Sequence, residues 1–116
     1  MEVGIDIVKI ERFKSKTKLA QRILSEEELD IYNTYNNENA KMLFLAGRFA
    51  AKEAIFKCFK KGDLTANYRD FIILNDESGA PYVKSKFLIN QEVLISISHI
   101  DSTAISNCVL ITKSKG

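Results

Sequence analysis

Apolar and polar residues alternate at the start of the chain. The apolar positions are Val3, Ile5 and Ile7, and their two-residue period predicts a half-buried β-strand. Asp6 lies between the last two of these positions, so it is an acid on a short first strand. The commonest place for such an acid is the solvent face of an edge strand, and a functional role is the alternative.

Two helices are predicted to follow this strand. The basic stretch of residues 9–22 contains no helix breaker and predicts the first of them. Ser25 and Glu28 have the spacing of a capping box, which predicts a second helix running towards Tyr35. The polar cluster at residues 33–39 then separates this helix from the next.

The longest helical signal covers residues 41–60. Apolar residues are spread around nearly its whole circumference, which predicts a central and largely buried helix that stops at Gly62. The second half of the chain, rich in β-branched residues, predicts strands at residues 71–74, 93–98 and 104–112 and a turn at residues 78–81. A strand, three helices and mostly antiparallel strands define an α+β fold.

Length and composition limit the class of protein. The 116 residues, 46% apolar and 28% charged, are enough for one core, so a single domain over residues 1–116 is expected. We find neither a secretory signal nor an apolar run of membrane-spanning length, and we expect a cytoplasmic location. Cys58 and Cys108 lack metal-ligand spacing and are expected to be reduced core residues.

The net charge of +2 is unevenly distributed along the chain. Residues 9–22 hold six bases and one acid, whereas the other positions hold eleven bases and fourteen acids. Such a segment attracts an acidic partner, unless it is only a solvated helix face. A non-enzymatic nucleic-acid-binding module is an alternative, but it needs aromatic residues among the bases, and the segment contains only Phe13.

Charged residues within the apolar helix are candidates for chemistry, because a charge there is paired, extended to solvent or functional. At about 100° per residue, Glu53 and Lys57 continue a stripe of two alanines. Arg48 and Lys52 lie on another flank of the helix. A carboxylate and an ammonium beside small residues suit a metal ion and a phosphate. The alternative is an ordinary ion pair worth ~0.3 kcal/mol.

His99 follows a strand that alternates isoleucine and serine, and it lies at the strand end, where ligand contacts are frequent. A lone histidine is more often a packed or surface residue than a catalytic one. From its position alone, both interpretations of His99 stay open.

Three sequence blocks together closely resemble the holo-acyl-carrier-protein synthases, which are short bacterial 4'-phosphopantetheinyl transferases. The blocks are Gly4-Ile5-Asp6-Ile7-Val8, then Phe44-Leu45-Ala46-Gly47-Arg48-Phe49-Ala50-Ala51-Lys52-Glu53-Ala54 with Lys57, and Ser96-Ile97-Ser98-His99. The middle block is long and specific, and the resemblance runs through nearly the whole chain.

The resemblance implies a magnesium-dependent transferase with coenzyme A as substrate. Such an enzyme moves 4'-phosphopantetheine to a serine of an apo acyl carrier protein, releases adenosine 3',5'-bisphosphate and supports fatty acid biosynthesis. The family's Mg²⁺ ligands map onto Asp6 and Glu53, and its phosphate-binding lysine maps onto Lys57. Glu53 and Lys57 are thereby the catalytic candidates. A catalytically dead scaffold would lack Asp6 or Glu53, and both are present.

On the nucleotide side of coenzyme A, the resemblance implies roles for Arg48 and His99. The family's Gly-Lys-Pro turn is Gly79-Ala80-Pro81 here, and Gly79 and Pro81 are expected to contact coenzyme A. The stretch that corresponds to the family's Gly-Thr-Gly loop is Lys60-Lys61-Gly62-Asp63.

The same resemblance implies that the acidic partner of the basic segment is the acyl carrier protein. Arg12 matches a carrier-docking arginine of the family, and charge alone adds Lys14, Lys16, Lys18 and Arg22. Neither nucleic acid nor a membrane is then expected as a partner. Relatives of this size form homotrimers with active sites between subunits, and the same assembly is expected here.

Overall fold

The computed structural model describes residues 1–59 and 67–113. In chain order its elements are β1 (Glu2–Lys9), the 3-10 helix η1 (Ile10–Phe13), α1 (Thr17–Ile23), α2 (Glu26–Thr34), α3 (Glu38–Cys58), the 3-10 helix η2 (Tyr68–Asp70), β2 (Ile72–Asn75), β3 (Pro81–Lys84), β4 (Gln91–His99) and β5 (Thr103–Thr112). The α+β class predicted from the sequence is confirmed. The stretch that corresponds to the family's Gly-Thr-Gly loop, residues 60–63, and the predicted helix stop at Gly62 lie outside the described residues.

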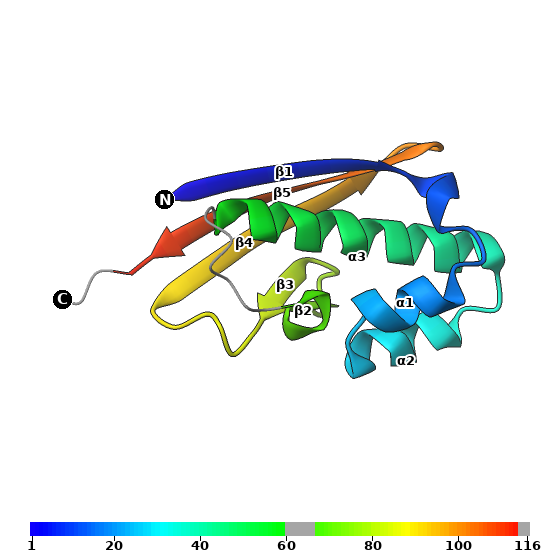
Figure 1. The fold of residues 1–116 in the computed structure, drawn as a ribbon, viewed down its shortest axis with the longest axis horizontal. Helices are drawn as coiled ribbons and strands as arrows, with labels where there is room; N and C mark the ends of the chain where they lie inside the picture. The colour runs from blue at the N-terminus through cyan, green and yellow to red at the C-terminus, as the bar shows by residue number, and fades with distance from the viewer. Residues whose placement is uncertain (60–66, 114–116) are drawn as a thin grey trace.

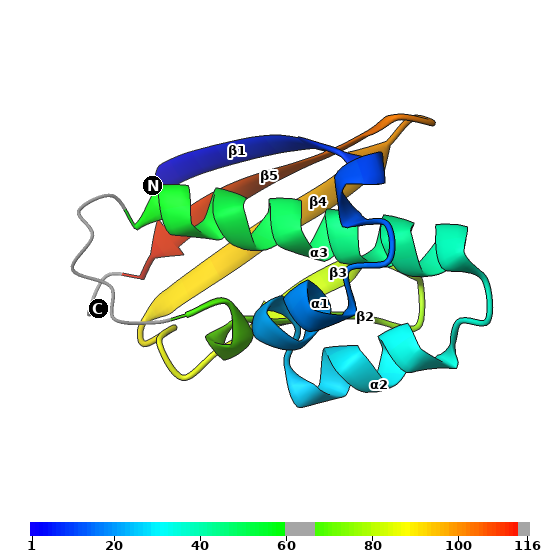
Figure 2. The ribbon, with the colours of Figure 1, turned by 45° about the vertical axis from the view of Figure 1, so that its right-hand side comes forward.

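A three-stranded antiparallel sheet in the order β1-β5-β4 forms one layer of the fold. Helix α3 runs across this sheet, while α1, α2 and the separate β2-β3 hairpin lie on the other side of α3 from β1 (Figures 1 and 2). Because it is covered on both sides, α3 is the buried central helix that the sequence predicted. Its side chains at Leu45, Ala50 and Ile55 are fully buried.

Strand β1 crosses α3 in direct backbone contact at Gly4. A Cβ atom at this position would lie 2.0 Å from the carbonyl oxygen of Ala54, so no larger residue fits without moving the strand. The close contact is made at Ala54, which is not one of the two alanines in the stripe with Glu53 and Lys57. Asp6 shares the face of β1 with Gly4, since side chains two residues apart point the same way.

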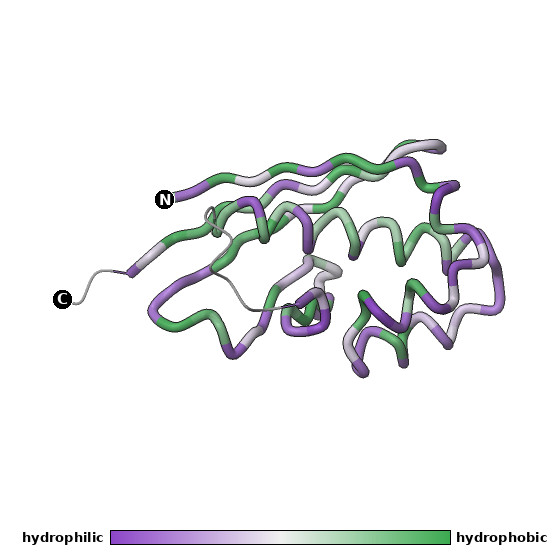
Figure 3. The backbone as a smooth tube through the Cα atoms, in the orientation of Figure 1, coloured by the Kyte–Doolittle hydropathy of each residue, from purple (hydrophilic) through white to green (hydrophobic). Residues whose placement is uncertain are grey.

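β1 is half buried, as predicted, but its alternating apolar residues lie on the exposed face. Apolar and polar residues alternate along the strand (Figure 3), but Val3, Ile5 and Ile7 are 61%, 55% and 64% exposed in the single chain. Asp6 is instead on the face that packs against α3, with 16% of its side chain exposed. The period of a strand identifies its two faces, whereas the elements packed beside it decide which face is buried.

The basic segment is not one continuous helix, contrary to the prediction. It forms η1 and α1, with a break at Ser15, whose φ is 54°. The Ser15 amide donates a hydrogen bond of 2.7 Å to Glu38 Oε1 at the start of α3, which holds the break in place. The second predicted helix is confirmed, because α2 begins with the Ser25–Glu28 capping box.

The predicted strands agree with β2, β4 and β5 to within a few residues. β3 was not predicted as a strand, since it is short and begins with Pro81 inside the predicted turn. Cys58 and Cys108 are both buried thiols, with sulfur atoms 3.2 Å apart. In the described ranges, no helix is long and apolar enough to cross a membrane.

A buried ion pair ties α2, α3 and β2 together. Lys52 Nζ lies 2.5 Å from Glu28 Oε1 and 2.7 Å from the carbonyl oxygen of Ile23, and both charged side chains are fully buried. Glu28 also accepts a hydrogen bond from the Ile73 amide through Oε2 at 3.0 Å. Burial lowers the pKa of Lys52, and the carboxylate of Glu28 acts in the opposite direction.

Removing one partner of this pair should destabilise the fold strongly. We expect Lys52→Met to lower the free energy of unfolding by about 3–5 kcal/mol, because the Glu28 carboxylate would stay buried without its cation. Urea unfolding followed by far-ultraviolet circular dichroism measures the change. The matched control is Lys84→Met, which removes a half-exposed pair with Glu27 and should cost less than ~1 kcal/mol. Equal effects of the two substitutions would contradict the structural role of Lys52.

Candidate active site

Asp6 and Lys57 meet where β1 crosses the C-terminal half of α3. Lys57 Nζ donates hydrogen bonds to Asp6 Oδ1 at 3.2 Å and to the carbonyl oxygen of Ile5 at 2.8 Å. The other carboxylate oxygen, Asp6 Oδ2, is buried and has no hydrogen-bond partner among the described residues. One oxygen of Asp6 is thus held by a cation, and the other is available to a ligand.

Glu53 lies on α3 one turn before Lys57, but the two side chains do not form the intrahelical ion pair considered from the sequence. Among the described residues, Lys57 pairs with Asp6. Glu53 Oε1 instead accepts a hydrogen bond from the hydroxyl of Tyr68 in η2. The strand crossing explains this outcome, because β1 presents a backbone carbonyl and a carboxylate to the lysine.

The pKa of the Tyr68 hydroxyl is changed by burial and by the charges around it. Burial raises the pKa of Tyr68 to about 12, and the hydrogen bond to Glu53 and its negative charge act in the same direction. Asp6 also raises this pKa, whereas Arg12 lowers it. Both acids and one arginine therefore lie close enough to Tyr68 to influence a single hydroxyl group.

The two acids are suitable ligands for a magnesium ion. Mg²⁺ prefers carboxylate oxygens, usually takes only one or two of them, and completes its shell with water and substrate phosphates. Asp6 Oδ2, buried without a partner in the described part of the chain, is such an oxygen. The described residues contain no cluster of three or more potential metal ligands, so Asp6 and Glu53 could hold the ion only together with water or substrate.

Glu53 also lines a groove of about 770 Å³ between α1, α3 and η2, which we call the Glu53 groove. Arg12, Arg22 and Arg69 contribute its cations, and Phe49 and Tyr68 contribute aromatic surface. The Arg12 guanidinium lies 5.1 Å from the centroid of the Phe49 ring.

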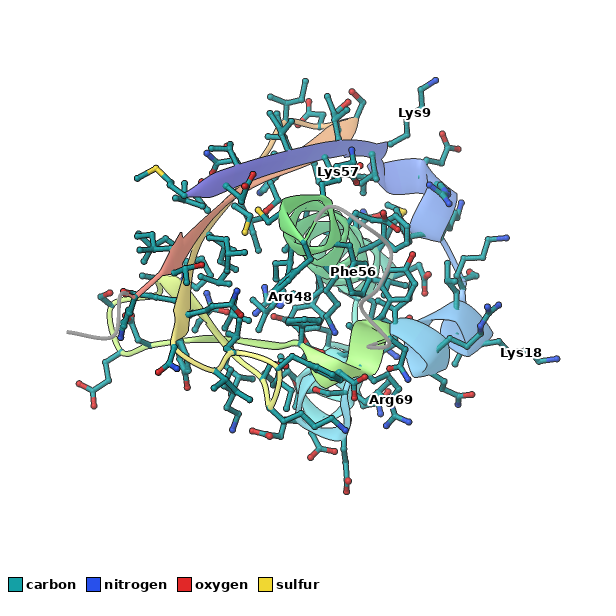
Figure 4. The ribbon with its side chains drawn as sticks, turned by 60° about the vertical axis from the view of Figure 1, so that its left-hand side comes forward. Lys9, Lys18, Arg48, Phe56, Lys57 and Arg69 are labelled. Atoms are coloured by element: carbon teal, nitrogen blue, oxygen red, sulfur yellow. The ribbon has the colours of Figure 1, made fainter. Side chains whose placement is uncertain are left out.

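The basic residues predicted to bind a partner divide into two sets. Arg12 and Arg22 line the Glu53 groove, whereas Lys14, Lys16 and Lys18 are exposed and do not line it. Lys18 extends away from the fold (Figure 4). The sequence reasoning missed Arg69, because it lies far outside the basic segment. Its Nε donates to the carbonyl oxygen of Leu24 at 2.9 Å, which brings it beside α1.

Arg48 and His99 line a second space of about 280 Å³, which we call the Arg48 cavity. The Arg48 guanidinium lies 4.4 Å from the centroid of the Phe44 ring. Its Nη2 donates to Asn75 Oδ1 at 2.6 Å, while its buried Nε has no partner among the described residues. Burial lowers the pKa of Arg48, but a guanidinium remains charged in proteins.

The predicted turn residues are connected to the Arg48 cavity through Asn75. While its Oδ1 accepts from Arg48, its Nδ2 donates to the carbonyl oxygen of Gly79 at 2.8 Å. Gly79 has φ 88°, a conformation that favours glycine, and Pro81 begins β3. Asn75 was missed from the sequence, since its role depends on a contact across 27 residues.

The Arg48 cavity and the Glu53 groove share no lining residue. Seen nearly along α3, Lys57 lies under β1 and Arg48 lies on a different side of the helix (Figure 4). The predicted separation of these flanks is confirmed. In one chain, the candidate site residues therefore form two separate regions.

Two acids suited to a divalent cation, with a lysine and a basic groove beside them, are typical of enzymes that transfer phosphate-containing groups. The family model of the 4'-phosphopantetheinyl transferase superfamily matches residues 2–109, so the chain belongs to this superfamily. The resemblance found from the three sequence blocks is confirmed, as is the enzyme class.

Curated relatives support the same family. The chain is 51% identical to a holo-[acyl-carrier-protein] synthase of Acholeplasma laidlawii over 113 residues, which cover 96% of each chain. It is 46% identical to the protein of the same name in Onion yellows phytoplasma, over 90% of this chain and 88% of the relative.

Solved structures support the fold. The structure resembles the crystal structure of a holo-(acyl-carrier-protein) synthase from Bacillus anthracis in complex with CoA (3',5'-ADP), with a TM-score of 0.85 and 31% identity over 97% of this chain and 96% of that one. It also resembles the Helicobacter pylori holo-[acyl-carrier-protein] synthase in complex with coenzyme A, with a TM-score of 0.79 and 29% identity over 94% and 99% of the two chains.

Proposed function

We propose that the chain transfers 4'-phosphopantetheine from coenzyme A to a serine of an apo acyl carrier protein and releases adenosine 3',5'-bisphosphate. The observation that carries the proposal is the contact between Asp6 and Lys57, which joins an acid and a cation 51 residues apart in the sequence. The curated relatives named holo-[acyl-carrier-protein] synthase support it. A role in fatty acid biosynthesis and a cytoplasmic location belong to the same proposal.

In the proposed reaction, the serine hydroxyl loses its proton to solvent and its oxygen forms a new bond to the phosphorus that carries pantetheine. The bond from that phosphorus to adenosine 3',5'-bisphosphate breaks, and the leaving group keeps the electron pair. Asp6 and Glu53 would hold Mg²⁺, which supplies charge neutralisation and orientation of the pyrophosphate when bound. Lys57 would bind phosphate charge on the leaving side, because its side chain is half exposed although Asp6 and Ile5 accept hydrogen bonds from its ammonium. Positioning and charge neutralisation then supply most of the rate.

The Glu53 groove is the proposed docking surface for the acidic carrier protein. Its arginines lie next to Glu53, so a carrier that contacts them would bring its serine near the two acids. Lys14, Lys16 and Lys18 lie outside the groove, where their charges attract the carrier over a longer distance.

We further propose a homotrimer with active sites between subunits. The outer face of the main sheet carries an apolar row across all three strands, in which Val3 pairs with Val109 and Val109 pairs with Leu94. Val3 and Leu94 are 61% and 50% exposed, and contiguous exposed apolar surface favours association. A second subunit would also bring an Arg48 cavity to the acids of the first, which no single chain does.

The first test is phosphopantetheine transfer itself. Incubation with coenzyme A, Mg²⁺ and an apo carrier protein should add the phosphopantetheine mass to the carrier, as measured by mass spectrometry. Asp6→Asn and Glu53→Gln should each reduce the rate by at least ~100-fold, since each removes a charged metal ligand. Asp30→Asn, at an exposed position of α2, is the control and should retain the parent rate.

No mass increase with several apo carriers would refute the transferase proposal. Substantial activity in either acid variant would remove that residue from the metal site. Circular dichroism and carrier binding show whether each variant is still folded.

The second test distinguishes the contribution of the Glu53 groove to carrier binding from that of the exposed lysines. Arg12→Glu with Arg22→Glu should weaken carrier binding by at least ~10-fold, because these charges lie at the docking surface. Lys14→Glu with Lys18→Glu makes the same charge change outside the groove and should mainly slow association at low salt. Surface plasmon resonance at two salt concentrations measures both rate constants. Equal losses in the two double variants would contradict a docking role specific to the groove.

The third test concerns the assembly. Light scattering after size exclusion should give three times the 13.1 kDa mass of one chain. Val3→Glu with Leu94→Glu should dissociate the trimer, because buried unpaired charges oppose association. Ile89→Glu changes an isoleucine outside β4 that is 73% exposed, and it should leave the mass unchanged. A monomeric parent chain, or a double variant of unchanged mass, would contradict this interface.

A further inference from the structure

Tyr68 lies outside all three sequence blocks, yet it makes a direct hydrogen bond to Glu53. Its ring is stacked against Phe49 at 5.7 Å between centroids, and it meets Phe56 edge-on at 5.1 Å. Both phenylalanines lie on α3, on the two sides of Glu53 in the sequence. The helix that carries the acid therefore also carries the aromatic residues that hold the tyrosine.

The short helix η2 fixes the backbone of Tyr68. Asn67 and Asp70 form a capping box around it, with the Asn67 amide 2.8 Å from Asp70 Oδ2. Arg69 connects η2 to the end of α1 through the carbonyl oxygen of Leu24. With its backbone and its ring both held, Tyr68 presents its hydroxyl to Glu53 from a fixed direction.

The hydrogen bond has two effects on Glu53. It engages Oε1, which gives the carboxylate a defined orientation, and no hydrogen bond to Oε2 is found among the described residues. It also directs the acid towards η2, whereas Lys57, one helical turn later, contacts Asp6 and Ile5.

We propose that Tyr68 is a positioning residue that orients the Glu53 carboxylate for a divalent cation. This inference rests on the proposed metal-binding role of Asp6 and Glu53. Hydrogen bonds to metal-ligating carboxylates orient the ligand before the ion arrives, and losing such a partner commonly weakens metal binding or activity by about 10–100-fold. The Tyr68 hydroxyl supplies such a bond to Glu53 from η2.

The test is Tyr68→Phe, which removes the hydroxyl and keeps the ring that packs between Phe49 and Phe56. Electron paramagnetic resonance of free Mn²⁺, with and without coenzyme A, measures cation affinity independently of turnover. We expect affinity about 10-fold weaker, a KM for Mg²⁺ raised by a similar factor, and kcat at saturating Mg²⁺ within about threefold of the parent. Tyr32→Phe makes the same change at a buried ring on α2 and should alter none of these values.

A second pair of variants, made in the Glu53→Asp chain, distinguishes a loss of carboxylate orientation from a general loss of stability. In Glu53→Asp the shorter side chain cannot reach Tyr68 in the same way, so adding Tyr68→Phe should weaken Mn²⁺ binding by less than about twofold. Mn²⁺ affinity in Tyr68→Phe equal to or tighter than that of the parent would overturn the inference while leaving the metal site intact. An equal loss in both backgrounds would also overturn it. If the parent chain binds no Mn²⁺ under either condition, the proposed metal site fails and this inference fails with it.

Discussion

The backbone contact between β1 and α3 at Gly4 brings together two residues of the candidate active site. Since the strand lies directly on the helix at Ala54, the next residue on the same face, Asp6, reaches the ammonium of Lys57. A side chain at position 4 would lift the strand and separate the two groups. Because residue 4 is a glycine, the Asp6 carboxylate and the Lys57 ammonium come within hydrogen-bonding distance although they are 51 residues apart in the sequence.

On the opposite side of α3, a buried ion pair rather than a backbone contact connects the helix to its neighbours. There the buried Lys52 joins Glu28 and the carbonyl oxygen of Ile23, so a lysine that immediately precedes Glu53 serves the fold. Lys57, one turn and a half further on, is half exposed and contacts β1. Two lysines of one helix therefore have different roles, and the elements packed on each side of the helix decide which role each takes.

The sequence predicted the elements that depend on local patterns. The capping box at Ser25 and the apolar circumference of α3 were visible in local patterns, whereas the family resemblance was needed to identify Asp6 and Glu53 as site residues. Features that depend on contacts between distant residues could not be predicted from the sequence. The break at Ser15 requires Glu38, the exposed face of β1 follows from how α3 packs, and the position of Tyr68 beside Glu53 requires a contact across 15 residues. Periodicity cannot specify such pairings, because each combines residues from separate elements.

The two hydrogen bonds of Lys57 have a consequence for substrate binding. An ammonium has three N–H groups, and among the described residues Ile5 and Asp6 accept from two of them, which leaves one for the phosphate oxygen that we propose as a ligand. A lysine already confined in this way has fewer rotamers to lose when a ligand arrives. Ordering a free lysine side chain costs up to about 2 kcal/mol, and the fold has met much of that entropic cost before any substrate binds.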